Sequence, residues 1–93
     1  MQEETQSVKL DCGIAHARLE AWLVDELALS KDDASMWVFE NGNASCIVAL
    51  SHLEDRKLGS FSFERTQVLV DGESAAVAAF MKLFTLRFVS AGG

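Results

Sequence analysis

Apolar and polar side chains alternate with a period of two at the start of the chain. Within residues 7–12 every second side chain is apolar, and Lys9 and Asp11 separate the apolar positions. This alternation is typical of a strand with one face buried. We therefore expect a first strand over residues 7–12, ended by Gly13.

From Ile14 to about Leu29 the apolar spacing changes to three and four, which predicts an amphipathic helix. One side should pack on a sheet and carries Ala15, Leu19, Trp22, Leu23 and Leu27. A second, shallower stripe consists of Ala17, Ala21, Val24 and Ala28. Such small residues permit the close approach of another helix. The charged residues 31–33 should then form a connection.

A tight hairpin is expected in the middle of the chain. Two β-type runs, residues 36–40 and 44–50, flank Asn41-Gly42-Asn43. An Asn-Gly pair supplies the positive φ angles that such turns require. The charged residues 53–59 are expected to form a loop after this hairpin.

Residues 60–70 predict a longer strand with an irregular pattern. Phe61 and Phe63 alternate in one phase, whereas Val68 and Val70 alternate in the other. We interpret this change of phase as a bulge or twist near Arg65 and Thr66.

A second helix should follow residues 71–74, which combine turn and helix-start chemistry, with Asp71 available as a cap. Its apolar stripe recurs at spacings of three and four and consists of Val77, Phe80, Met81, Phe84 and Phe88. The alternation of Phe84, Leu86 and Phe88 leaves a final strand over residues 84–88 as the alternative.

The predicted order is β-α-β-β-β-α. We expect one α+β domain over residues 1–93, with an antiparallel-rich sheet and two helices packed on one face in a two-layer arrangement. Residues 1–6 are expected to be disordered, and residues 90–93 to be a frayed C-terminus.

Charge narrows the choice of partner. Eight basic and fourteen acidic residues give a net charge of −6, which repels nucleic acid and anionic membrane surfaces. The excess lies in residues 1–50, with nine acids and three bases, and would steer a basic partner there. The start of the chain lacks a secretory pattern, and the apolar stretch 75–89 is too short to span a bilayer. We therefore expect a soluble cytoplasmic protein.

Two cysteines and two histidines match the number of ligands in a zinc site: Cys12, His16, Cys46 and His52. Their spacings, C-x3-H and C-x5-H, are not those of known zinc motifs, so we predict no metal. Cys12 with His16 is a candidate nucleophile and base. The alternation of Cys12 with apolar neighbours instead favours a buried thiol, and we interpret both cysteines as thiols.

Residues 52–57 form the densest polar run, and Glu64 and Arg65 are expected to lie near it. An acid/base pair is the catalytic interpretation, and a solvated loop is the simpler one. The sequence contains no nucleotide-binding, nucleophile-elbow or metalloprotease motif. We therefore expect no enzymatic activity and no cofactor.

The C-terminal Gly92-Gly93 resembles the end of a ubiquitin-like or sulfur-carrier protein only in those two residues. Glycine also commonly follows the end of a helix. The apolar stripe that reaches Phe88 favours the helix end, and a C-terminal carrier protein stays as an alternative.

Apolar residues outside the main stripes predict a function in binding, as a homodimer or with a protein partner. The candidate interface consists of Leu83, Leu86, Val89, Ala17, Ala21, Val24 and Ala28. The alternative is a small-ligand-binding protein or enzyme with a pocket between helices and sheet, and its candidate walls are Trp22, Trp37 and Phe61.

Overall fold

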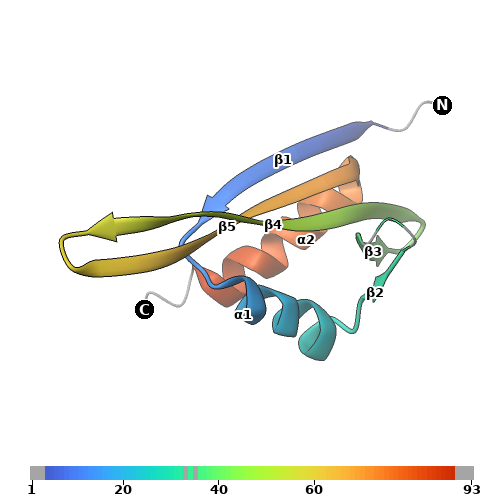
Figure 1. The fold of residues 1–93 in the computed structure, drawn as a ribbon. Coiled ribbons are helices and arrows are strands. Elements are labelled where there is room, and N and C mark those ends of the chain that lie inside the picture. The colour runs from blue at the N-terminus through green and yellow to red at the C-terminus, as the bar shows by residue number, and fades with distance from the viewer. Residues whose placement is uncertain (1–3, 33, 35, 90–93) are drawn as a thin grey trace.

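The computed structural model describes residues 4–32, 34 and 36–89. These residues form a five-stranded antiparallel sheet in the order β1-β5-β4-β3-β2, with the helices packed on one face (Figure 1). This is the two-layer α+β fold that the sequence predicts. The elements are β1 (Thr5–Cys12), α1 (His16–Ala21), a π-helical segment η1 (Trp22–Glu26), β2 (Ser30–Lys31), β3 (Trp37–Asn41), β4 (Ala44–Leu58), β5 (Phe61–Glu73) and α2 (Ser74–Phe88).

Strand β1 lies at one edge of the sheet and begins two residues before the predicted start. Thr5 and Gln6, which were expected to be disordered, pair with Glu73 and Gly72 of β5. The carbonyl of Glu4 accepts a hydrogen bond of 2.9 Å from the backbone N–H of Ser74. The start of β1 is thereby joined to the start of α2.

The first helix is shorter than the predicted range of 14–29. It changes from α1 to η1 at Trp22, and Ala28 has a positive φ of 55°, which an α-helix does not accommodate. Its predicted packing side is confirmed, because Leu19, Trp22 and Leu23 are buried.

The core lies between the helices and one face of β4 and β5. Val48, Val68 and Val70 are at most 1 % exposed. From α2, Phe80 stacks on Trp22 with ring centroids 5.5 Å apart. Burying each large apolar side chain contributes roughly 1.5 to 3 kcal/mol, so this layer contact is the main source of stability.

Helix α2 continues to Phe88, so the helical prediction for residues 84–88 is confirmed and the alternative of a final strand is wrong. The prediction that Asp71 caps this helix is also wrong. Asp71 belongs to β5, and the N-cap residue is Glu73. Strand pairing extends beyond Val70 because β1 offers partners to residues 71–73 and β4 offers partners to Asp71 and Gly72. Residues 90–93, including the two terminal glycines, lie outside the described residues.

The β3–β4 hairpin is confirmed. Asn41 pairs with Ala44 across a two-residue turn in which Gly42 has a φ of 62°. The predicted connection over residues 31–33 is partly strand, because Lys31 pairs with Trp37 in the short strand β2. Asp33 lies outside the described residues.

The prediction of a loop over residues 53–59 is wrong. Strand β4 continues to Leu58, turns through Gly59 and Ser60, and pairs with β5 from Phe61 onward. We call residues 53–65 the arm, because this part of the hairpin projects beyond the helices (Figure 1). Charged side chains do not prevent pairing there, since both sides of the arm are open to solvent.

The irregularity predicted near Arg65 lies on the neighbouring strand. Leu53 pairs with Arg65, but the next pair is Arg56 with Phe63, so Glu54 and Asp55 together oppose Glu64. Two residues opposite one define a β-bulge. Strand β5 itself is continuous. Phe61 and Phe63 lie on one of its faces, and Val68 and Val70 lie on the other.

Among the described residues, no helix has both the length and the apolar character needed to cross a bilayer.

Candidate functional site

The arm carries an apolar surface on the side of the sheet opposite to the helices, which we call its outer side. Thr66, Val68 and Val70 of β5 are buried on the helix side. Because side chains alternate along a strand, Phe61 and Phe63 belong to the outer side. The cross-strand pairs Leu58–Phe61 and Arg56–Phe63 add their β4 members to the same side.

Three large apolar side chains of the outer side are open to solvent. Phe61 is 68 % exposed, Leu58 53 % and Phe63 48 %. The two phenylalanine rings stack with their centroids 6.5 Å apart. Large apolar side chains gathered on one side of a projecting element are characteristic of a binding surface.

A groove of about 520 Å³ lies between the arm and the end of β1. It is lined by Asp11, Gly13, Arg56, Leu58, Phe63 and Arg65. Arg65 donates to both carboxylate oxygens of Asp11, with Nε–Oδ1 and Nη2–Oδ2 distances of 3.2 and 2.7 Å. Arg56 forms no ion pair with any residue that the structure describes. Asp11 and Arg65 neutralise each other, so Arg56 leaves the groove with one positive charge in an acidic chain.

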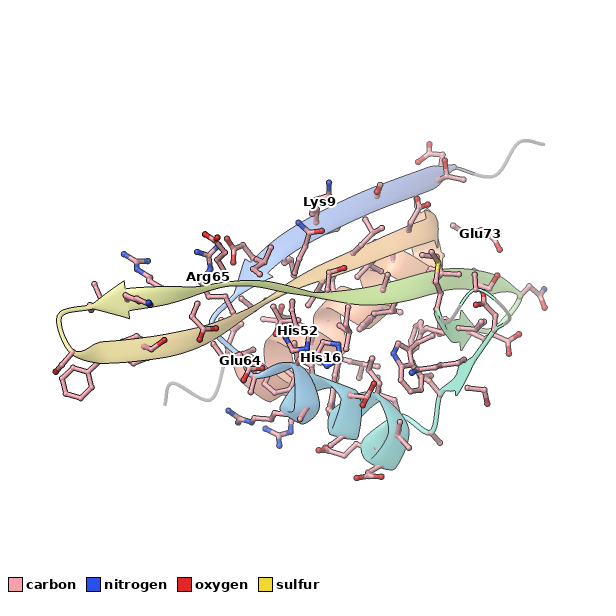
Figure 2. The ribbon with its side chains drawn as sticks, viewed as in Figure 1. Lys9, His16, His52, Glu64, Arg65 and Glu73 are labelled. Atoms are coloured by element: carbon pink, nitrogen blue, oxygen red, sulfur yellow. The ribbon has the colours of Figure 1, made fainter. Side chains whose placement is uncertain are left out.

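The base of the arm is attached to the first helix through residues on the opposite side of the sheet (Figure 2). Glu64 Oε2 accepts a hydrogen bond of 2.8 Å from the backbone N–H of His16, the first residue of α1. The rings of His16 and His52 stack with centroids 4.3 Å apart. The N-cap residue Ala15 has no side-chain cap, so the Glu64 carboxylate satisfies a backbone donor at the helix start.

This cluster contains three of the residues for which the sequence suggested acid/base or nucleophilic chemistry, namely His16, His52 and Glu64. His52 and Cys12 both pair with Thr66, from opposite sides of β5. Partial burial, with a smaller effect of Asp11, raises the pKa of the Cys12 thiol. A raised pKa keeps the sulfur protonated at neutral pH and makes it a poor nucleophile.

Cys46 is buried in β4, six positions before His52. Burial, and to a lesser extent Asp71, raises the pKa of its thiol to about 11. Both cysteines are free, which confirms the interpretation as thiols. Within residues 4–32, 34 and 36–89, no group of three or more His, Cys, Asp or Glu side chains is arranged to hold a metal ion.

The structure places every residue of the predicted interface at the surface. The exposed fractions are 37 % for Leu83, 57 % for Leu86, 61 % for Val89 and 43 % for Val24, and Ala17, Ala21 and Ala28 are also exposed. A groove of about 320 Å³ between η1 and α2 includes Leu83 and Leu86. The ion pair of Arg87 with Glu26, at 3.3 Å, joins its two sides. An interface on this helix side stays a prediction.

Of the residues predicted as pocket walls, Trp22 and Trp37 belong to the core cluster, whereas Phe61 does not. Trp22 is buried against three phenylalanines of α2, and Trp37 is buried in β3, with the Lys31 ammonium 4.8 Å from its ring centroid. Phe61 directly follows the turn that joins β4 to β5 at the end of the arm.

The sequence analysis did not predict the apolar surface on the outer side of the arm, although it singled out Phe61 as a candidate pocket wall. The available signal was Gly59-Ser60 between Leu58 and Phe61, since a Gly-Ser pair between two β-type residues is a hairpin turn. The contact of Asp11 with Arg65 in the groove could not be predicted from a local sequence pattern, because the two residues are 54 positions apart.

No known protein family, no curated protein and no solved structure matches this chain. Its geometry is therefore the basis for a proposed function.

Proposed function

We propose that this protein is a protein-binding domain and that the outer side of the arm is its docking surface. The observation that carries the proposal is the exposure of Leu58, Phe61 and Phe63 on one side of a hairpin that projects beyond its own core. The fold gains little from these side chains, because they cover no part of the core cluster. A partner that covered them would gain roughly 1.5 to 3 kcal/mol for each fully buried side chain.

The groove beside the arm indicates the chemistry of the partner. Arg56 and Phe63 are directly opposite each other on β4 and β5, and aromatic and arginine residues are the types most enriched where binding energy is concentrated. No residue that the structure describes forms an ion pair with Arg56, and a guanidinium binds a carboxylate in two-pronged geometry. The surface therefore fits an apolar protein segment that carries an aspartate, a glutamate or a terminal carboxylate.

The arm is preferred to the helix side because the groove beside its exposed apolar side chains contains the charge of Arg56, which no ion pair among the described residues neutralises. On the helix side, Glu26 and Arg87 already neutralise each other across the groove. The arm groove is also an open surface feature and not a cavity within the core, which suits a chain segment better than an enclosed small molecule. Self-association through the helix side and small-ligand binding are the alternatives that the following experiment separates.

The test is selection of a displayed random-peptide library on the immobilised protein. We expect enrichment of peptides that combine apolar residues with Asp or Glu. The double variant Phe61→Ser/Phe63→Ser should bind them roughly tenfold more weakly or worse. Val89→Ser is the matched control, because Val89 is 61 % exposed but lies on the helix side, and it should bind as the wild type does.

Charge reversal tests the role of the groove. Arg56→Glu should shift the selected peptides from acidic to basic residues, since it reverses the charge in the groove without changing a buried contact. The proposal fails if no peptide is enriched, or if the enriched peptides bind the double variant as well as they bind the wild type. Peptides lost with Val89→Ser alone would place the docking surface on the helix side.

A further inference from the structure

We infer that β1 pairs with β1 of a second copy of this chain, antiparallel and about a two-fold axis, so that two sheets become one. Strand β1 is an edge strand of eight residues without proline. No other element of the described chain runs along its outer edge (Figure 1). An edge of this length presents a row of unpaired backbone groups to any complementary strand.

The direction of those backbone groups follows from the sheet register. Asn41 and Ala44 flank a two-residue turn, so they exchange hydrogen bonds, and even-numbered residues of β4 bond to β3. Odd-numbered residues of β4 therefore bond to β5, and even-numbered residues of β5 bond to β1. The bond from the N–H of Ser74 to the carbonyl of Glu4 agrees with this order. The N–H and C=O groups of Thr5, Ser7, Lys9 and Asp11 consequently point away from the sheet.

One pairing register of the two β1 strands brings all of these backbone groups into hydrogen bonds. With Val8 opposite Val8 of the second copy, Ser7 faces Lys9 and Thr5 faces Asp11, each in both directions. Each of the four pairs exchanges two backbone hydrogen bonds, about eight in total. No like charges are directly opposite in this register.

Other symmetric registers form fewer pairs or bring like charges together. A register centred on Ser7 keeps only three of the four pairs, because β1 begins at Thr5. A shift that centres the axis on Lys9 places the two lysines opposite each other, which is destabilising. A shift that centres it on Leu10 leaves only Lys9 and Asp11 with strand partners, because β1 ends at Cys12. Lys9 thus disfavours one competing register and also discourages pairing with foreign strands.

The side chains near the two-fold axis can bring the hydrophobic cores of the two copies into contact. Val8 and Leu10 are half-buried and pack against the core cluster from its edge. In the proposed register the two Val8 side chains meet on the helix side of the sheet, so each covers the open flank of the other core. Apolar cross-strand pairs of this kind stabilise the pairing of two strands.

Sedimentation of purified protein at micromolar concentration tests the pairing. The wild type should be a dimer. Ser7→Pro should be a folded monomer, because proline removes an outward N–H and is tolerated where the N–H of an edge strand faces solvent. Ser7→Thr keeps the N–H and should remain dimeric. A monomeric wild type, or a Ser7→Pro variant that still dimerises, would overturn the inference.

Cross-linking tests the register without relying on proline. In a Cys12→Ser background, Val8→Cys should form an intermolecular disulfide under mild oxidation, because directly opposite residues of a non-hydrogen-bonded pair are about 4.5 Å apart between Cα atoms. Leu10→Cys should not, since its counterparts would be four residues apart, about 13 Å. Linkage through Leu10→Cys in place of Val8→Cys contradicts the register, and linkage through neither contradicts the pairing.

The pairing uses backbone groups of β1, whereas docking uses the exposed side chains of the arm, and Asp11 is the residue that borders both. Phe61→Ser/Phe63→Ser should remain dimeric, and Ser7→Pro should still bind the selected peptides. Failure of one proposal is thereby distinguishable from failure of the other.

Discussion

At the residue scale, Gly72 shows how closely β4 and β5 approach each other. Gly72 pairs with Cys46 and has a φ of 153°. A Cβ atom at this position would lie 2.5 Å from the Cys46 Cα and 2.7 Å from the Ser45 carbonyl oxygen. Both obstacles are backbone atoms, which cannot rotate away. The sequence marked Gly72 as a turn residue, whereas its role is to permit this contact within the sheet.

Gly72→Ala should therefore lower the free energy of unfolding by at least about 2 kcal/mol, through combined steric overlap and backbone strain. Urea denaturation measures the change. Gly13→Ala is the control, because its Cβ would meet nothing within 4 Å, and it should leave the denaturation midpoint close to that of the wild type. Equal midpoints for the two variants would show that the β4–β5 contact is looser than described.

The thiol of Cys46 should make stability depend on alkaline pH. Burial, followed by Asp71, raises its pKa from the ordinary value of 9.0 to about 11 in the folded chain. The folded state therefore retains the proton that the unfolded state loses. This stabilisation is fully present below about pH 9 and is lost as the pH rises through 11.

We expect the free energy of unfolding to fall by at most about 3 kcal/mol between pH 8 and pH 11 through this group. Cys46→Ala should be less stable at pH 8 but should have a shallower slope, because the titrating thiol is gone. Parallel pH profiles for the two proteins would mean that the thiol is not shielded from water.

At the element scale, the arm and the rest of the β4–β5 hairpin should differ in local stability. Side chains of residues 66–70 pack into the core on alternate positions, whereas Phe61, Ser62, Phe63 and Glu64 are all exposed. Opening of the arm consequently exposes little additional apolar surface. Amide hydrogen exchange should be much faster at residues 54–64 than at Val48, Val68 and Val70. Uniform protection along the hairpin would indicate that something covers the arm in the isolated protein.

Helix α2 provides a matched pair of neighbouring side chains. Phe84 is 5 % exposed and its ring centroid lies 6.0 Å from that of Trp22, whereas Leu83 is 37 % exposed. Phe84→Ala should cost roughly 3 to 5 kcal/mol, which can unfold a domain of this size. Leu83→Ala should cost less than about 1.5 kcal/mol. Thermal denaturation compares the stability of the two variants. Similar losses of stability would mean that the helix is rotated relative to the sheet.

Elements with one buried face could be predicted from the sequence. Strand β1, the β3–β4 hairpin and α2 were found because apolar and polar positions record which side faces the core. The arm could not be found in this way, because both of its sides are open to solvent and Glu54 to Lys57 resemble a charged loop. The end of the first helix at Glu26 was also missed, since the positive φ of the nearby Ala28 has no sequence signal.

At the scale of the whole molecule, the arm lengthens the protein to 54 Å against 33 and 24 Å in the other two directions. The candidate site could not be predicted at this scale, because it depends on the sheet order. Strand β1 lies beside β5 and not beside its neighbours in sequence, and only this order brings Asp11 to Arg65. Two chains joined through β1 would present two arms, so binding to a partner with two segments would gain from multivalency.

The most direct test of docking on the arm is a titration of the isotope-labelled protein with a selected acidic peptide, followed by NMR. Backbone amide shifts should change at residues 56–63 and at Asp11 and Gly13, which line the groove. Residues 83–88 of α2 should keep their shifts. The largest changes on α2, or no changes on the arm at saturating peptide, would contradict the proposed docking surface.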